Sequence, residues 1–260
     1  MSNKEGATLP FIHMKNITTI FYIPKERISK GYVRMDKEES NHLVRVLRFK
    51  VNDRFIVTDG EGFKSWALLE KADNNYALSK LIDDDLPGLS PELPIDIDVA
   101  VGIIRPSRFE NMVEMLVHLG VKKIIPLITT YSEIQNIKRV SSNDYHERLN
   151  RIAISGMKSS LRSYLPEVTE PVDIIDFLKK NEYKNIFFGE AEGLPNIGNS
   201  HIKDSRLLIL IGPEGGFSHR EIETICDYKG FPVNLGRTRL RTETAAVTMT
   251  VKIMNELRLI

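Results

Sequence analysis

Cysteine is almost absent from this chain, whose 260 residues include only Cys226. A single thiol excludes both a disulfide framework and a cluster of thiolate metal ligands. Long apolar runs are also lacking, since the longest stretches, around Val99–Ile104 and Leu207–Ile211, fall far short of the ~18 residues of a membrane span. The N-terminus has no apolar segment of the kind found in signal peptides. We therefore expect a cytoplasmic protein with no metal and no membrane partner.

An excess of charge of one sign is missing too. The chain has 36 Lys and Arg residues and 35 Asp and Glu residues, which leaves a net charge of +1. This balance argues against a uniformly basic nucleic-acid binder but leaves local basic patches open. The hydrophobic fraction of 42% is enough for a core. The length suggests one large domain or two unequal ones.

The pattern of predicted secondary structure changes near residue 90. After a tail over residues 1–18, residues 19–90 predict a small β-barrel that ends in an acidic, proline-rich linker around Asp83–Pro91. Residues 91–260 alternate strands and helices, which predicts an α/β domain with a mainly parallel sheet. Predicted strands are Thr19–Ile23, Tyr32–Met35, Arg54–Thr58, Ser65–Glu70, Tyr76–Leu81, Ile95–Val101, Lys123–Leu127, Asn185–Phe188, Arg206–Ile211 and Phe231–Asn234, and predicted helices are Glu38–Leu47, Ser107–Leu119, Asp144–Met157, Asp173–Lys179 and Thr242–Leu257.

One further helix has marked ends. Ser218 and Glu221 fit a capping box at its start, and Phe217 can pack against Ile222. Gly230 is expected to end it as a C-cap glycine. Asp36 is a plausible N-cap for the helix in the N-terminal domain.

The segment Leu207–Glu221, LLILIGPEGGFSHRE, is the strongest single feature. A buried strand ends in a glycine-rich loop, and ligands of open α/β sheets bind beyond the carboxyl ends of strands. The spacing fits neither a phosphate loop nor a dinucleotide fingerprint, and Glu214 would repel a pyrophosphate. The loop therefore suits a neutral or cationic ligand, although a tight structural turn would look the same.

Two basic segments follow different patterns. Arg237, Arg239 and Arg241 lie in LGRTRLRTETAA, and their guanidinium groups suit phosphates or planar groups. In NHLVRVLRFK, helical spacing would place Arg45 and Arg48 on one face. Taken alone, each segment is more commonly a solvated helix surface. The histidines show no metal-binding spacing, and no G-x-S-x-G motif supports a hydrolase.

These segments together resemble the RsmE-type family of 16S rRNA uridine-N3 methyltransferases. The matching pieces are HLVRVLR at 42–48, DG at 59–60, HLGVKKIIPL at 118–127, MKSSLRSYLP at 157–166, IGPEGGFS at 211–218 and LGRTRLRTETA at 235–245. The resemblance implies a PUA-like RNA-binding β-barrel over residues 19–90. It also implies a SPOUT α/β domain with a deep trefoil knot over residues 91–260, and a homodimer with its sites at the subunit interface.

The resemblance also implies a cofactor and roles for individual residues. S-adenosylmethionine would bind Ile211, Gly212, Glu214, Gly215, Gly216, Leu235, Gly236, Leu240 and Arg241. Arg241 would stabilise the negative charge that develops on the uracil ring, and Glu243 would orient Arg241. Arg45, Arg48, Lys50, Arg162 and Arg239 would contact RNA. We expect weak, steeply salt-dependent binding of free RNA.

Four positions depart from the family pattern. Met115 and His118 replace a Lys and a Glu, Tyr131 replaces an Arg, and Ser159 replaces a Gln. The cofactor loops are intact, so the changes fall on the substrate side. The alternative function is a diverged knotted protein that binds RNA or assists ribosome assembly, with altered or lost methyltransferase activity.

Overall fold

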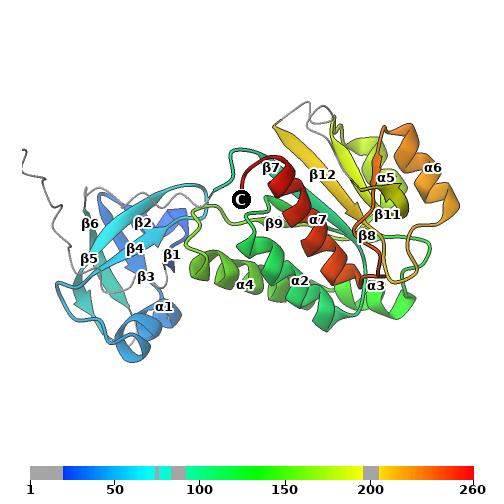
Figure 1. The fold of residues 1–260 in the computed structure, drawn as a ribbon. Helices are drawn as coiled ribbons and strands as arrows, with labels where there is room; N and C mark the ends of the chain where they lie inside the picture. The colour runs from blue at the N-terminus through cyan, green and yellow to red at the C-terminus, as the bar shows by residue number, and fades with distance from the viewer. Residues whose placement is uncertain (1–19, 74–75, 83–91, 196–204) are drawn as a thin grey trace, which may run out of the picture.

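The computed structural model describes residues 20–73, 76–82, 92–195 and 205–260, which form two regions side by side (Figure 1). The predicted tail, the linker around Asp83–Pro91 and the first residue of the first predicted strand lie outside these residues. The N-terminal elements are β1 (Phe21–Tyr22), η1 (Lys25–Arg27), β2 (Ile28–Ser29), β3 (Tyr32–Met35), α1 (Lys37–Asn41), η2 (His42–Val46), β4 (Arg54–Thr58), β5 (Lys64–Ala72) and β6 (Ala77–Ile82).

The N-terminal strands form one sheet in the order β1-β4-β5-β6-β3-β2. Only the β1–β4 pair among these described strands is parallel, and the others are antiparallel. Alternate residues point to one side of the sheet and bury a small core. That core includes Phe21, Val33, Phe55 and Leu69. The predicted strands at 32–35 and 54–58 are confirmed residue for residue.

The predicted helix at Glu38–Leu47 is confirmed in place but not in form. The Asp36 carboxylate caps α1 by accepting a hydrogen bond from the Glu39 amide at 2.9 Å. The helix then widens into one π-helical turn, η2, and ends at Val46. Arg48 lies beyond it with a left-handed φ of 56°. The prediction that Arg45 and Arg48 share a helical face is therefore wrong, because the chain has already left the helix.

The C-terminal region is an α/β domain built on a parallel sheet. Its elements are β7 (Asp96–Gly102), α2 (Pro106–His118), β8 (Lys123–Ile128), α3 (Ile134–Val140), α4 (Asn143–Ser159), β9 (Glu167–Val168), β10 (Val172–Asp173), α5 (Ile174–Lys180), β11 (Ile186–Leu194), β12 (Arg206–Ile211), α6 (His219–Asp227), β13 (Phe231–Val233) and α7 (Thr242–Glu256). The strand order is β10-β8-β7-β12-β11-β13, with β9 beside β8. Three of these elements, α3, β9 and β10, were not predicted. No described helix combines the length and apolar character needed to cross a membrane.

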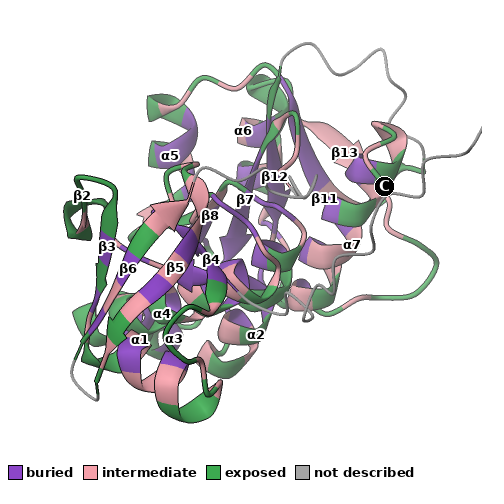
Figure 2. Ribbon diagram, turned by 90° about the vertical axis from the view of Figure 1, so that its left-hand side faces the viewer, coloured by how far each residue is buried: buried purple, intermediate pink, exposed green. Residues whose placement is uncertain are grey.

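Helices cover both faces of this sheet, as a parallel sheet requires. Apolar residues of α2, α4 and α7 pack on one face, and those of α5 and α6 pack on the other. Figure 2 shows the buried strands β7, β8 and β12 between these helical layers. The sheet thus presents the carboxyl ends of its strands, and the loops that follow them, along one edge.

Helix α6 begins as predicted and ends differently. The capping box is confirmed, since the Ser218 amide donates to Glu221 Oε2 at 2.7 Å and the Glu221 amide donates to Ser218 Oγ. At the other end Lys229, not Gly230, adopts the left-handed conformation, with φ of 62°. Gly230 donates to the Ile225 carbonyl at 2.8 Å, where a Cβ would clash with the Ile225 side chain. Gly230 is thus required for this close approach.

The two regions are joined by residues 158–165, which we call the joint segment. From the N-terminal side, the Gly60 carbonyl accepts from the Leu165 amide at 2.8 Å and the Gly62 amide donates to the Ser163 carbonyl at 3.0 Å. Lys64 Nζ donates to the Leu161 carbonyl at 2.8 Å. The Asp59-Gly60 motif is thereby explained as a turn that docks on the joint segment.

The C-terminal side of the joint segment depends on Arg162, whose side chain is 2% exposed. Its guanidinium donates to the carbonyls of Val117 and Val121 at 3.0 and 3.2 Å and to the Glu92 carboxylate at 3.1 Å. Burial lowers the pKa of Arg162, and Glu92 opposes that shift. The other Glu92 oxygen accepts from the Ser163 amide at 2.6 Å. Arg162 is therefore a structural cation.

Replacement of Arg162 with Met should destabilise the protein by about 3 kcal/mol, because it leaves a mostly buried carboxylate without its partner. Urea unfolding followed by circular dichroism measures this change. Arg148→Met is the control, since Arg148 forms a surface ion pair with Glu110 and is itself mostly exposed. Equal unfolding midpoints for the two variants would contradict the structural role of Arg162.

Candidate functional site

A cavity of about 960 Å³ lies at the carboxyl edge of the parallel sheet. Three chain segments line it: residues Gly189–Ala191 of β11, the loop after β12 at 211–217, and the loop between β13 and α7 at 234–242. This is the edge at which open α/β sheets bind ligands. The cavity brings together the two glycine-containing motifs that lie well apart in the sequence.

The structure places all the predicted cofactor residues on this one cavity. They come from both loops, so neither motif alone forms the site. The residues are Ile211, Gly212, Glu214, Gly215, Gly216, Leu235, Gly236, Leu240 and Arg241.

Glycine is required in the cavity wall for two reasons. Gly216 and Gly236 have positive φ values of 76° and 134°, and both face open space. Gly212 packs so closely that a Cβ there would lie 2.8 Å from the Gly216 carbonyl carbon. At these glycines the wall is main chain, whose N–H and C=O groups a ligand can approach directly.

The arginines of the second loop differ in their surroundings. Arg239 Nη2 donates to the Glu214 carbonyl at 2.7 Å and so ties one loop to the other. Arg241 is exposed and forms the N-cap position of α7. Within the described residues its guanidinium has no hydrogen-bond or ion-pair partner. Arg241 is thus available to a substrate at the cavity mouth.

Glu243 does not pair with Arg241, and the prediction that it orients Arg241 is wrong. Its Oε1 atom lies 3.8 Å from Nε of Arg108, at the start of α2. The same guanidinium lies 3.5 Å from the Glu214 carboxylate. Arg108 thus joins the first turn of α7 to the loop after β12. Glu243 lies beside the cavity, not in its lining.

Glu221, the capping-box residue, also fixes a neighbouring loop. Its Oε1 atom accepts a hydrogen bond from the Thr130 amide at 2.8 Å. The next residue, Tyr131, is 53% exposed and packs across Gly215, where a Cβ would lie 2.8 Å from the Tyr131 Cβ. The glycine-rich loop therefore packs against the β8–α3 loop.

The structure leaves four of the predicted RNA contacts exposed and buries the fifth. Arg45, Arg48 and Lys50 are exposed in the N-terminal region, and Arg239 is exposed beside the cavity. Arg162 is buried in the joint segment, so its prediction as an RNA contact is wrong. The family-like motif around it serves the fold, because the main chain on either side of Arg162 is bonded to the N-terminal region.

Sequence reasoning missed Arg108 and the segment Gly189–Ala191. The segment could have been found from its position, since it directly follows the predicted strand that ends at Phe188. Arg108 had no such signal, because its role depends on α2 and α7 packing together.

The four departures from the family pattern lie in different places. His118 and Ser159 contact each other, with Nε2 and Oγ 3.0 Å apart. These two departures from the family pattern therefore form one local pair. Met115 and Tyr131 are exposed.

Comparison with known proteins identifies both regions of the chain. Residues 91–254 match a model described as an RNA methyltransferase domain, and residues 36–82 match an RNA methyltransferase PUA domain. A ribosomal RNA small subunit methyltransferase E from Rickettsia conorii is 30% identical, covering 89% of this chain and 93% of the relative. That from Bacillus subtilis is 27% identical, covering 80% and 84%.

Solved structures agree with this assignment. A probable rRNA-methyltransferase from Porphyromonas gingivalis has a TM-score of 0.75 at 30% identity, covering 93% of this chain and 99% of that one. A ribosomal RNA small subunit methyltransferase E from Neisseria gonorrhoeae, bound to S-adenosyl methionine, has a TM-score of 0.78 at 25% identity, covering 92% and 97%. The chain therefore belongs to the RNA methyltransferase family that includes ribosomal RNA small subunit methyltransferase E.

Proposed function

We propose that this protein transfers a methyl group from S-adenosylmethionine to N3 of a uridine in 16S ribosomal RNA. The observation that carries the proposal is the single cavity formed by both predicted cofactor loops, with a free arginine at its mouth. Family membership supports the same reaction. The relatives named above are small-subunit rRNA methyltransferases, and the Neisseria gonorrhoeae structure contains the cofactor.

The cavity fits this cofactor by size and by chemistry. Its volume lies in the range of ligand sites that enclose most of a small molecule. The bare backbone around Gly212, Gly216 and Gly236 offers donors and acceptors to adenine and ribose. Glu190 and Glu214 supply carboxylates in the lining that suit a cationic sulfonium, while Arg237, Arg239 and Arg241 in the same lining suit the anionic RNA.

When bound, S-adenosylmethionine supplies the methyl group on its sulfonium. The uracil N3–H proton must leave, so negative charge develops on the ring imide. Arg241 would stabilise that charge, since it is exposed at the cavity mouth and at the N-terminal end of α7. The uridine has to be unstacked to reach the cavity, and Arg45, Arg48 and Lys50 are candidate contacts to the RNA phosphates.

Several finer features belong to the same proposal. The N-terminal sheet would close as a PUA-like barrel, and residues 91–260 would form the SPOUT domain with its trefoil knot. The return of α7 onto β7 and β12, after β13 on the far side of β11, supports such threading. The homodimer belongs to the proposal through the family resemblance alone. The protein would act in the cytoplasm.

The reaction is tested by calorimetry with S-adenosylmethionine and by mass analysis of 16S rRNA from a strain that lacks the gene. Binding of the cofactor and loss of one N3-methyluridine are expected. Failure to bind the cofactor would reject the proposal. Binding with unchanged rRNA would instead favour a role in RNA binding or ribosome assembly.

Replacement of Arg241 with Ala should lower the rate of methyl transfer by about 100-fold or more, because a preorganised positive charge is lost where negative charge develops. The measurement is single-turnover methylation of unmodified small subunits at saturating cofactor. Arg220→Ala is the matched control, since Arg220 is exposed on α6 and does not line the cavity. Near-normal turnover of the Arg241 variant would remove it from this role.

Replacement of Arg108 with Met should weaken cofactor binding about fivefold, because the loop that carries Glu214 loses its tie to α2 and α7. Calorimetry of the variant provides the affinity. Arg105→Met, an exposed arginine just before α2, should bind as the unaltered protein does. Unchanged affinity in the Arg108 variant would show that the tie does not hold the loop.

A further inference from the structure

The N-terminal sheet has a second side that the proposed reaction does not use. Because side chains alternate along a strand, the residues between the core positions point away from the core. We call this side the outer face. It carries Tyr32 and Arg34 on β3, Arg54 on β4, Trp66, Leu68, Glu70 and Lys71 on β5, and Leu78 and Lys80 on β6.

The strand register arranges these side chains in two rows across the sheet. In the first row Tyr32 is opposite Lys80, Lys80 is opposite Leu68, and Leu68 is opposite Arg54. In the second row Leu78 lies between Arg34 and Lys71. Neighbouring strands are about 4.8 Å apart, so each cation lies next to an apolar or aromatic side chain.

The charge of the outer face is predominantly positive. Its exposed cations are Arg34, Arg54, Lys71 and Lys80. The carboxylate of Glu70, on the same face, is half-buried. In the part of the chain that the structure describes, neither Lys71 nor Lys80 belongs to an ion pair. In a chain with a net charge of +1, such a local concentration favours a polyanionic partner.

Aromatic side chains accompany these cations. Tyr32 and Tyr76 are 36% and 37% exposed, and the Arg34 guanidinium lies over the Tyr76 ring at 6.0 Å. Trp66 is half-buried on the same face, where it lies between Ile56, which is buried, and Ile82. Exposed aromatic rings next to arginine and lysine are typical of surfaces that stack unpaired bases and hold the backbone between them.

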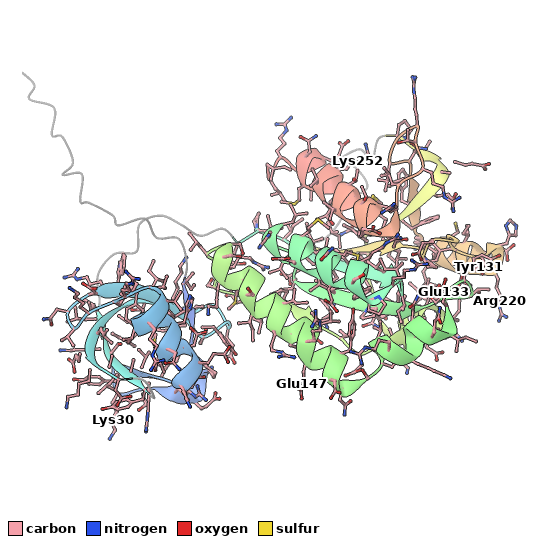
Figure 3. The ribbon with its side chains drawn as sticks, turned by 90° about the horizontal axis from the view of Figure 1, so that it is seen from below. Lys30, Tyr131, Glu133, Glu147, Arg220 and Lys252 are labelled. Carbon is pink, nitrogen blue, oxygen red and sulfur yellow. The ribbon has the colours of Figure 1, made fainter. Side chains whose placement is uncertain are left out.

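We propose that the outer face binds a single-stranded segment of the substrate RNA. The proposal rests on the proposed function for the identity of the RNA. It adds a surface distinct from Arg45, Arg48 and Lys50, which lie on η2 and the turn before β4. Figure 3 shows Lys30, between β2 and β3, at the opposite end of the molecule from Tyr131, which packs on the cavity loop. The outer face would therefore hold RNA at a distance from the reacting nucleotide.

The first test is the double substitution Arg34→Gln and Lys80→Gln. Affinity for a short single-stranded RNA is measured by fluorescence anisotropy over a range of KCl concentrations, without cofactor. We expect about tenfold weaker binding, and a slope of log affinity against log salt that is smaller by about 1.4, because two phosphate contacts are lost. Lys179→Gln with Lys180→Gln, exposed on α5, is the control of equal charge. Unchanged affinity and slope in the first variant would overturn the proposal.

The second test uses Trp66, the one tryptophan of the chain, as a reporter on the outer face. Its emission should change when the RNA binds. Tyr32→Ala should weaken binding about tenfold through the loss of stacking, whereas Tyr228→Ala, a similarly exposed tyrosine on the other region, should not. Loss of binding only in Arg45→Gln with Arg48→Gln would overturn the proposal by placing the RNA on η2.

Two outcomes separate this proposal from its alternatives. In the first, binding to vesicles of anionic lipid is measured with the same variants. If the vesicles displace the RNA and their binding depends equally on Arg34 and Lys80, the proposal is overturned in favour of a membrane surface. Calorimetry with S-adenosylmethionine is performed on the same variants, and their cofactor affinity should be unchanged. If the unaltered protein binds RNA at the outer face but binds no cofactor, the proposed function fails, while RNA binding at the outer face holds for an RNA that is not the methylation substrate.

Discussion

The buried guanidinium of Arg162 is the constraint on which the arrangement of this molecule depends. It satisfies two main-chain carbonyls at the end of α2 and neutralises Glu92, and the other Glu92 oxygen holds the next residues of the chain. Those residues then dock on the Asp59-Gly60 turn of the N-terminal region. Because a buried charge is costly unless it is fully paired, these contacts hold the joint segment against the C-terminal region. The N-terminal region is then bonded to the main chain of the same segment.

The cavity is built differently, because part of its wall is main chain that ion pairs and hydrogen bonds hold in shape. The wall around Gly212, Gly216 and Gly236 is bare main chain, so its shape must be fixed from behind. Ion pairs and hydrogen bonds to the loops that form or flank the cavity do this from three directions, through Arg108, Arg239 and Glu221. Arg241 is left exposed at the mouth. In this site the residues that hold the loops are therefore different from Arg241, the residue proposed to act on the substrate.

The structure also explains how a chain with a net charge near zero can have local basic surfaces. Many cations of the chain are used within the fold, as Arg162, Arg206 and Lys158 are in ion pairs with Glu92, Asp98 and Glu39. Others remain exposed on the outer face and around the cavity. A local basic patch therefore coexists with an overall balance that would not suggest one. Net charge describes solubility and long-range attraction, whereas the contacts depend on placement.

Features that rest on local chemistry could be predicted from the sequence: the strands Tyr32–Met35, Arg54–Thr58 and Arg206–Ile211, the Asp36 cap, the capping box at Ser218, and the two loops that meet at the cavity. Local periodicity and capping act within a few residues, so they can be read along the chain. The burial of Arg162 and the pairing of Glu243 with Arg108 depend on contacts between distant segments. Packing also sets the end of α6, where Lys229 takes the left-handed conformation and Gly230 packs against Ile225. Those outcomes depend on which groups from separate segments pack together and lose their water, and sequence spacing carries no record of that.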